Sequence, residues 1–198
     1  MTHYFTTPDG PQQRRTAEME VWGHALTMTT ARGTFSTDGL DLGTRVLVRS
    51  VTPDPAATHV LDLGCGWGPI AVGLGLSLPR AKVDAVDTNE LALELTRENA
   101  ASHGIGDRLR ATTPDAALPP ADGYDEIWSN PPIRIGKPAL HELLLTWLPR
   151  LAPQGRAHLV VGKNLGADSL QRWLGGQGFP TSRMASAKGF RVFCTTKG

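Results

Sequence analysis

A glycine-rich segment at residues 62–68 (DLGCGWG) constrains the fold of this chain more than any other feature. It follows the apolar run 60–63, which is typical of a buried strand, and precedes an apolar stretch at 69–78 that we expect to be a helix. Gly64 permits a tight turn, and Gly66 lets a ligand approach the backbone because it carries no Cβ. The segment therefore predicts a strand–turn–helix unit with a ligand at the turn.

The spacing of the glycines distinguishes two classes of cofactor. The dinucleotide fingerprint G-x-G-x-x-G would need a glycine where this chain has Pro69. Glycines at 64, 66 and 68, with Asp62 two residues ahead, are instead typical of methyltransferases, whose cofactor has no pyrophosphate. Asp87 ends the next strand about 20 residues after Gly68, the separation expected for an acid that binds ribose hydroxyls. The pattern predicts S-adenosylmethionine as the cofactor.

The neighbours of these residues complete the expected cofactor site. Cys65 lies inside the turn and Thr88 follows the strand end, and both are expected to contact the cofactor. Asp115 follows a presumed third strand and is a candidate acceptor for the adenine amino group. Asp84 is an alternative to Asp87, but its position within the strand is expected to point it to the other face. Trp67 is expected to be partly exposed beside the cofactor.

From residue 58 onward the chain alternates strand and helix patterns. Strands are expected at 60–63, 82–86, 124–129, 157–162 and 190–195, and helices at 69–78, 89–102, 139–151 and 168–174, with Asn89 as an N-cap. This alternation predicts an α/β fold in which a mostly parallel sheet carries helices on both faces. We expect residues 58–198 to form the core.

Residues 1–57 are expected to form an extension that packs on this core, so that the whole chain is one domain. The pattern predicts a short helix at 16–24, a hairpin turn at 31–33 and a helix at 40–50. The formal net charge of +1 gives no bulk electrostatic argument for nucleic acid. We expect a cytoplasmic protein with no membrane segment, no disulfide and no metal site, since neither apolar runs nor ligand spacings indicate one.

The segment 129–132 (SNPP) follows the strand expected at 124–129 and indicates a type of chemistry. An amino group on a ring or an amide is a poor nucleophile because its lone pair is delocalised. The side-chain oxygen of Asn130 and the carbonyl of Pro131 can each accept one N–H hydrogen bond and aim the lone pair at a methyl donor. Pro132 makes the turn rigid. We therefore predict catalysis at Asn130, Pro131 and Pro132.

Beyond these motifs, the chain resembles class I methyltransferases of the N-P-P type, and most of all the small-subunit ribosomal RNA guanine-N2 methyltransferase family (RsmC-like), including its short single-domain members. The resemblance extends over nearly the whole chain and is carried by segments 3–5, 33–36, 40–44, 62–68, 130–137 and 188–192. It implies a Rossmann-like fold with a seven-stranded, mostly parallel sheet. It also implies S-adenosylmethionine at Asp62, Gly64, Gly66 and Asp87, with catalysis at Asn130.

The same resemblance implies contacts that the spacing alone does not. Phe35 matches a segment that lies against the cofactor in the family. Family members commonly have an aromatic residue after the prolines, where this chain has Ile133. Ile133 is therefore expected to offer apolar contact to a base, and the basic residues near the crevice are candidates for RNA phosphates: Arg134, Lys137, Lys163, Lys188 and Arg191.

The sequence leaves three functions open. The first is methylation of the exocyclic N2 of a guanine in small-subunit (16S) ribosomal RNA, with the RNA or the small subunit as partner and S-adenosylhomocysteine as product. The second is a protein glutamine N5-methyltransferase, because an amide nitrogen needs the same two acceptors. The third is a non-catalytic partner protein that binds S-adenosylmethionine, against which the presence of Asn130 argues.

Overall fold

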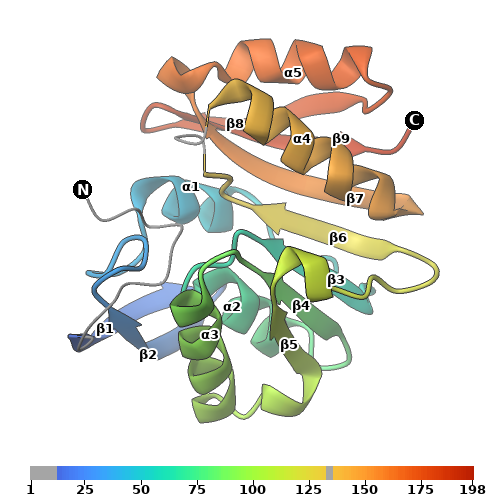
Figure 1. Ribbon diagram of the computed structural model, residues 1–198. Helices are drawn as coiled ribbons and strands as arrows, with labels where there is room; N and C mark the ends of the chain where they lie inside the picture. The colour runs from blue at the N-terminus through green and yellow to red at the C-terminus, as the bar shows by residue number, and fades with distance from the viewer. Residues whose placement is uncertain (1–12, 133–135) are drawn as a thin grey trace.

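The computed structural model describes residues 13–132 and 136–198, and its centre is a seven-stranded sheet in the order β5-β4-β3-β6-β7-β9-β8 (Figure 1). The strands are β3 (His59–Leu63), β4 (Lys82–Val86), β5 (Leu109–Thr112), β6 (Tyr124–Ser129), β7 (Leu151–Gly162), β8 (Thr181–Ala187) and β9 (Phe190–Thr196). Pairing is parallel from β5 to β7, and β9 runs antiparallel to both β7 and β8. The sheet is the mostly parallel α/β sheet that the sequence predicted.

Helices cover both faces of the sheet (Figure 1). The helices α1 (Leu42–Ser50), α2 (Pro69–Ser77) and α3 (Glu90–Ser102) pack on one face, while α4 (Lys137–Trp147) and α5 (Ala167–Gly176) pack on the other. Successive strand residues alternate between the two apolar cores, since Val60 joins the first and Leu61 the second. Four segments are short 3-10 helices in the described residues: η1 (Gly106–Arg108), η2 (Pro114–Ala116), η4 (Leu148–Arg150) and η5 (Lys163–Leu165).

The described part of the N-terminal region begins with a β-hairpin, so the helix predicted at 16–24 is wrong. The strands β1 (Arg14–Val21) and β2 (His24–Ala31) pair antiparallel around a turn at Trp22 and Gly23. Alanine, glutamate and methionine favour a helix here, but the apolar residues of β1 alternate with charged ones at a period of two. This alternation buries one face of the strand, and tertiary packing overrides the local propensity.

The hairpin turn also lies elsewhere than predicted, at Trp22 and Gly23 rather than at 31–33. Both residues have positive φ angles, 47° and 82°, as a tight two-residue hairpin turn requires. Trp22 reaches inward from this turn, where its indole nitrogen donates to the carbonyl of Val51 at 2.8 Å. Its ring meets the fully buried Trp128 edge-on at 5.0 Å between centroids. The turn is therefore anchored in the core.

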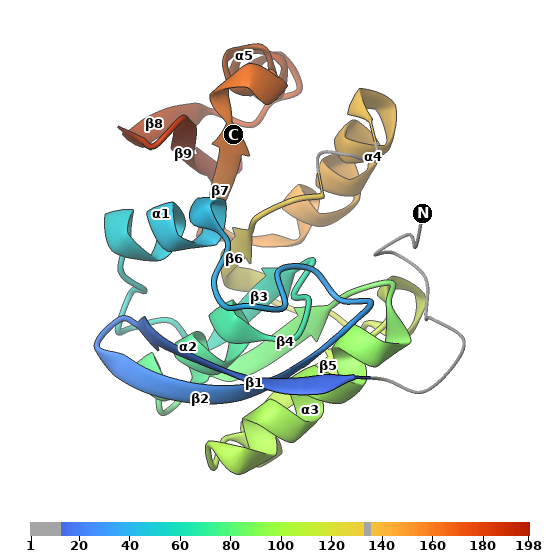
Figure 2. The ribbon, with the colours of Figure 1, turned by 90° about the vertical axis from the view of Figure 1, so that its left-hand side faces the viewer.

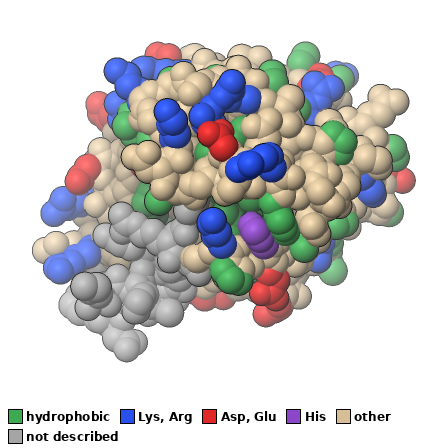
Figure 3. All heavy atoms as spheres, turned by 90° about the horizontal axis from the view of Figure 1, so that it is seen from above, with side chains coloured by type: hydrophobic (Ala, Val, Ile, Leu, Met, Phe, Trp, Pro, Cys, Tyr) green, Lys and Arg blue, Asp and Glu red, His purple; other side chains and the backbone are tan. Residues whose placement is uncertain are grey.

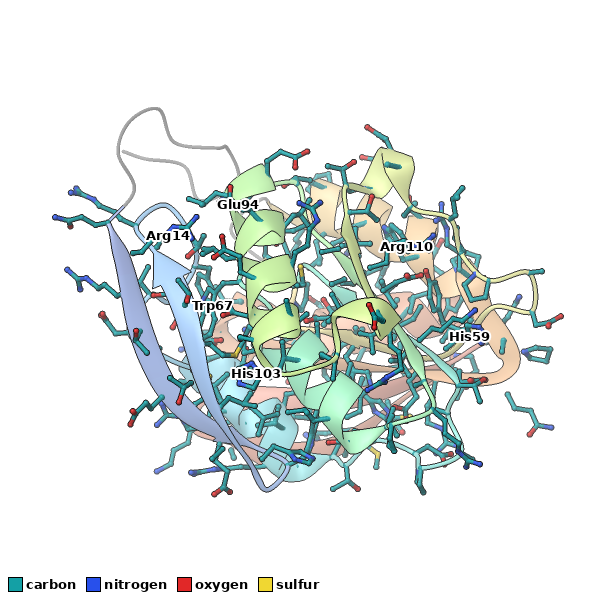
Figure 4. The ribbon with its side chains drawn as sticks, turned by 90° about the horizontal axis from the view of Figure 1, so that it is seen from below. Arg14, His59, Trp67, Glu94, His103 and Arg110 are labelled. Carbon is teal, nitrogen blue, oxygen red and sulfur yellow. The ribbon has the colours of Figure 1, made fainter. Side chains whose placement is uncertain are left out.

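Contacts to α3 hold the rest of the hairpin. The side-chain amide of Asn99 accepts from the N–H of Thr29 at 2.7 Å and donates to the carbonyls of Thr29 and Trp67, both at 2.9 Å. Arg14 of β1 forms ion pairs with Glu94 and Glu98, and Figure 4 shows Arg14 facing Glu94 on α3. Hairpin, α3 and glycine turn are thus one packed unit.

Within the core, most expected elements are present with small shifts. The strands β4 and β6 have the expected bounds, and the Asn89 side chain caps α3 by accepting from the N–H groups of Leu91 and Ala92. The helix expected at 139–151 ends at Trp147, and β7 starts at Leu151 rather than at 157. The polar β8 was not predicted because an exposed edge strand lacks the apolar alternation that reveals a buried one.

None of the helices in residues 13–132 and 136–198 combines the length and apolar character of a membrane span. Over the same residues, no group of three or more histidine, cysteine, aspartate or glutamate side chains is arranged to hold a metal ion.

Candidate active site at the carboxyl ends of the strands

A cavity of about 340 Å³ lies beyond the carboxyl ends of β3, β4 and β6. Its size falls within the range of about 300–1,000 Å³ typical of small-molecule sites. Three segments supply most of its wall: the glycine turn at 63–67, the loop and helix start at 34–44, and the turn at 130–132 after β6. In Figure 2 the loop between β2 and α1 lies across the end of β3, which brings the N-terminal segment to the glycine turn.

The glycine turn forms an open cradle. Gly64, Gly66 and Gly68 have φ angles of 76°, 57° and 92°, a left-handed conformation that other residues rarely adopt. A Cβ on Gly68 would lie 2.9 Å from the Thr96 side chain, so close packing also requires glycine there. A Cβ on Gly66 would meet nothing within 4 Å, because the space above it belongs to the cavity. This turn fits a ligand that contacts backbone.

Asp87 lies at the end of β4 and lines the cavity. Its two oxygens accept from the N–H groups of Gly66 and Asn89, each at 2.9 Å, which fixes the carboxylate beside the turn. Burial raises its pKa from the ordinary value, although these backbone N–H groups oppose the shift. Each oxygen retains capacity to accept a ligand hydroxyl. Thr88 also lines the cavity, as expected for this side of the site.

Asp84, the alternative to Asp87, faces away from this cavity. Its carboxylate accepts from the Arg110 guanidinium at 2.8 and 2.9 Å and from the Tyr124 hydroxyl at 2.7 Å. The side chain has structural partners on the opposite side of the strand, in agreement with its expected orientation.

Two acids that the sequence placed among the cofactor contacts do not line the cavity. Asp62 is only 1% exposed, and it accepts from the N–H of Ala71 at 2.9 Å, so it stabilises the start of α2 from beneath the turn. Burial raises its pKa to about 8, and its other oxygen has no hydrogen-bond partner among the described residues. Asp115 is exposed in η2, where Pro114 takes its place in the wall.

The segment at 34–36 covers the glycine turn. The carbonyl of Phe35 accepts from the indole nitrogen of Trp67 at 2.8 Å, and the Asn89 side chain donates to the carbonyl of Gly33 at 3.0 Å. Phe35 lines the cavity with half of its surface exposed. Trp67 is 2% exposed, so the expectation of a partly exposed ring is wrong, because this loop covers it. Cys65 is buried, and burial raises the pKa of its thiol, which suits a packing role.

Asn130 lies at the end of β6 and lines the cavity together with Pro131 and Pro132. The preceding residue, Ser129, donates to the carbonyl of Leu63 at 2.7 Å and ties the end of β6 to the end of β3. A Cβ on Gly64 would lie 3.8 Å from Pro132, so the two turns lie against each other. The side-chain amide of Asn130 therefore lies beside the cradle, at the position that the sequence predicted.

No role was predicted for the residues that contact the Asn130 side chain. Its Nδ2 donates to both oxygens of Asp41, at 3.0 and 3.1 Å, and to Thr44 Oγ1 at 3.0 Å. Asp41 lies within the helix expected at 40–50 and is the N-cap of α1 in the structure. A contact between residues so far apart in the chain leaves no local signal. The apolar residues Leu143, Leu165 and Phe190, which also line the cavity, were missed for the same reason.

The basic residues of the expected substrate surface fall into two groups. Lys137, Lys163 and Lys188 are exposed. Arg191 is only 8% exposed and forms an ion pair with Asp168 at 2.8 Å, so its expected contact with phosphate is wrong. It lies within β9, where pairing to β7 and β8 carries its side chain under α5.

Ile133 and Arg134, also expected at the substrate, lie outside the described residues. Figure 3 shows the face over α4, α5 and β8, where lysine and arginine side chains are more abundant than acidic ones. The exposed basic residues of these elements and the neighbouring turns are Lys137, Lys163, Arg172, Arg183 and Lys188.

The model of one protein family covers residues 25–194, which include the hairpin, the glycine turn and the Asn-Pro-Pro turn. The chain belongs to the methyltransferase small domain family. It is 30% identical over 169 residues to the uncharacterized protein YbxB of Bacillus subtilis, with 84% of each chain covered. The expected family is therefore confirmed at the level of this domain.

Two further relatives connect the fold with named proteins. The chain is 34% identical over 120 residues to the ribosomal RNA small subunit methyltransferase C of Salmonella choleraesuis, and the match covers 61% of this chain but 34% of that relative. The structure of the 16S rRNA N2 methyltransferase RsmC of T. thermophilus, in complex with AdoMet and guanosine, superposes with a TM-score of 0.75 at 21% identity, covering 96% of this chain and 52% of that one. The likeness confirms the Rossmann-like methyltransferase fold.

Proposed function

We propose that this methyltransferase transfers the methyl group of S-adenosylmethionine to the exocyclic N2 of a guanine in small-subunit ribosomal RNA. The observation that carries the proposal is the position of Asn130, whose side chain lies beside the open glycine cradle. The RNA substrate rests on the RsmC relatives, of whose length this chain spans about a third in the curated match. Such a substrate places the protein in the cytoplasm.

The glycine turn, Asp87 and Thr88 form what we call the cofactor wall. Asp87 offers two carboxylate oxygens to ribose hydroxyls, and the positive-φ glycines let the ligand lie on the backbone. Phe35 lines the cavity next to this wall. When bound, S-adenosylmethionine supplies a sulfonium-activated methyl group. The residues of the chain bind the cofactor and orient it, and they need no acid or base of their own to activate the methyl.

We call the other side of the cavity the acceptor wall. It consists of Asn130 with Asp41 and Thr44, the two prolines after Asn130, and the apolar residues Leu143, Leu165 and Phe190. The apolar residues give a planar base a surface to pack on. Phe190 supplies the aromatic ring that the family commonly places after the prolines. Asn130 Oδ1 and the Pro131 carbonyl then each accept one N–H of the amino group and aim its lone pair at the methyl.

These acceptors also stabilise the reaction. The nitrogen gains positive charge as it attacks, and the preorganised oxygen dipoles of Asn130 and Pro131 stabilise that charge. The exposed residues Lys137, Lys163 and Lys188 surround the same end of the molecule and would contact RNA phosphates, which position the substrate without reading its sequence. As the methyl passes from sulfur to the nitrogen, the nitrogen becomes cationic and releases one proton to solvent. The methylated guanine therefore keeps one N–H and loses one of the two bonds that held it.

The experiment that tests the proposal offers methyl-labelled S-adenosylmethionine and the enzyme to three acceptors in parallel: protein-free ribosomal RNA, assembled small subunits and a soluble protein extract. The proposal predicts label in small-subunit RNA, recovered after digestion as N2-methylguanosine. Label found only in protein as N5-methylglutamine would replace the RNA substrate by the glutamine alternative. Tight cofactor binding without label in any acceptor would favour the non-catalytic alternative.

A further inference from the structure

The side-chain amide of Asn130 is held from behind by the N-terminal segment. Its Nδ2 donates to Asp41 Oδ1 and Oδ2 at 3.0 and 3.1 Å and to Thr44 Oγ1 at 3.0 Å. An amide nitrogen carries two protons, and these acceptors occupy both. Nδ2 therefore has no proton left for a ligand, and Oδ1, which accepts no hydrogen bond from the described residues, is the atom that the amide can offer to the cavity.

Chemistry alone fixes this orientation. A carboxylate only accepts hydrogen bonds, so a flipped Asn130 would place its Oδ1 against the negative oxygens of Asp41 and would lose two bonds. Most asparagine orientations depend on weaker preferences. Here the charged neighbour excludes the alternative, and the amide presents its oxygen to the acceptor before any substrate arrives.

We propose that Asp41 is a positioning residue for methyl transfer: together with Thr44 it locks the Asn130 amide so that Oδ1 faces the amino group to be methylated. This inference rests on the proposed function. The carboxylate also polarises the amide, since a hydrogen bond to Nδ2 increases the negative charge on Oδ1. That charge favours the positive charge that develops on the attacking nitrogen.

The fold fixes Asp41 itself by a second set of bonds. Asp41 is the N-cap of α1, where its Oδ1 accepts from the N–H groups of Gly43 at 2.8 Å and Thr44 at 3.2 Å. A Cβ on Gly43 would lie 2.9 Å from the Phe190 ring, so glycine there lets the acceptor wall close around the capped turn. Asp41 therefore has two roles, to cap a helix and to hold Asn130, which suitable variants can separate.

Asp41→Ser separates these roles, because serine caps a helix about as well as aspartate but is too short to reach Asn130. We expect kcat to fall about 10- to 100-fold in Asp41→Ser, the cost of a misplaced catalytic group, while the Kd of S-adenosylhomocysteine and the melting temperature stay close to those of the wild type. Asp38→Ser is the matched control: Asp38 lies three residues earlier, and its exposed side chain forms an ion pair with Arg15 and does not line the cavity, so kcat should not change. A wild-type kcat in Asp41→Ser overturns the proposal.

A double variant tests whether Asp41 acts through Asn130. If it does, Asp41→Ser causes no further loss of kcat once Asn130 is alanine, whereas independent roles would multiply their losses. Thr44→Val, which keeps the shape of the side chain and removes the acceptor oxygen, should show the same dependence with a smaller loss. Full multiplication of the two losses contradicts the positioning role.

A spectroscopic measurement makes the inference independent of turnover. The side-chain amide resonances of Asn130 in a ¹⁵N-labelled sample are identified by their absence in Asn130→Ala. We expect Asp41→Ser to shift them and Asp38→Ser to leave them in place. Resonances that stay in place in Asp41→Ser overturn the proposal even if the wild type methylates no acceptor, whereas that absence of turnover would by itself remove the proposed function.

Discussion

The two walls of the cavity are built in different ways. The cofactor wall comes mainly from one continuous β3-α2-β4 unit, in which the glycine turn and Asp87 are linked by the bond from the Gly66 N–H. The acceptor wall is assembled from the start of α1, the end of β6, α4, η5 and the start of β9, which are distant in sequence. The first wall follows from a local motif, whereas the second exists only once the whole sheet has formed.

The difference between the walls indicates where substitutions can change the methyl acceptor without loss of cofactor binding. In the proposed function, a unit whose parts are adjacent in sequence binds the cofactor. The acceptor side draws on separate segments, each of which can change alone. We therefore expect substitutions in the acceptor wall to affect transfer and those in the cofactor wall to affect affinity, and the following variants test that separation.

The largest effect is expected at Asn130. Asn130→Ala removes the oxygen that we propose accepts from the attacking amino group, and we expect kcat to fall about 10²- to 10³-fold, as for loss of one preorganised polar group. The Kd of S-adenosylhomocysteine, measured by calorimetry, should stay at the wild-type value. An unchanged kcat would show that Asn130 has no part in the mechanism. A large change in Kd would show that Asn130 also contributes to cofactor binding.

Asp87 should show the reverse pattern. Asp87→Ala removes an acceptor that is charged and largely buried, and we expect the cofactor Kd to rise about 10- to 100-fold, as for the loss of hydrogen bonds to a charged group. Asp84→Asn is the matched control on the same strand, because Asp84 pairs with Arg110 outside the cavity. Calorimetry measures the cofactor Kd of both variants. Equal values for Asp87→Ala and Asp84→Asn would show that Asp87 does not bind the ribose.

The buried Asp62 should make stability depend on pH. Burial raises its pKa from 3.8 to about 8, so between these values the folded protein keeps a proton that the unfolded chain has released. Its contribution to stability is therefore complete below about pH 4 and is lost as the pH rises through about 8.

Asp62→Asn is neutral at every pH and keeps an acceptor for the N–H of Ala71. We expect the melting temperature of the variant, relative to wild type, to rise by about 2–4 °C or more between pH 5 and pH 8 in thermal scans, a change of at least 1 kcal/mol in a chain of this size. A difference that stays constant over this range contradicts a raised pKa.

The smallest effects are expected on the basic surface. Lys163→Ala and Lys188→Ala should each weaken RNA binding a few-fold for any sequence, and each should reduce the slope of log Kd against log salt by about 1. Arg191→Met should leave that slope unchanged and lower the melting temperature, because Arg191 is paired with Asp168. Filter binding at several salt concentrations checks these slopes, and a reduced slope for Arg191→Met would return that residue to the RNA surface.

The sequence predicted the cofactor wall better than the acceptor wall for physical reasons. A glycine turn between a strand and a helix has a fixed geometry, so the positions of Gly64, Gly66 and Asp87 follow from spacing. The same spacing could not show that Asp62 points beneath the turn, because a shift of one position along a strand reverses the face. Asn130 was predicted from its turn, but its partner Asp41 depends on the packing of α1 against the sheet.

The N-terminal hairpin shows the same limit. Alanine, glutamate and methionine in β1 suit a helix. The strand is selected by burial of one face of β1, by the core contacts of Trp22 and by the bonds from Asn99 to Thr29 in β2. Arg191 shows this limit for the expected RNA surface. Its charge indicated a contact with RNA, but its burial in an ion pair with Asp168 depends on how β9 is placed. Local patterns thus predict elements and turns, and tertiary contacts decide which side chains reach the cavity.

The most direct test of the separation between the walls is the single-turnover rate of the Asp87→Ala/Asn130→Ala double variant at saturating S-adenosylmethionine. Saturation removes a defect that lies only in cofactor affinity, so we expect the double variant to transfer methyl at the rate of Asn130→Ala alone. A double variant that is slower than Asn130→Ala by a further factor of ten or more would show that Asp87 also acts in transfer, and that the two walls do not have separate roles.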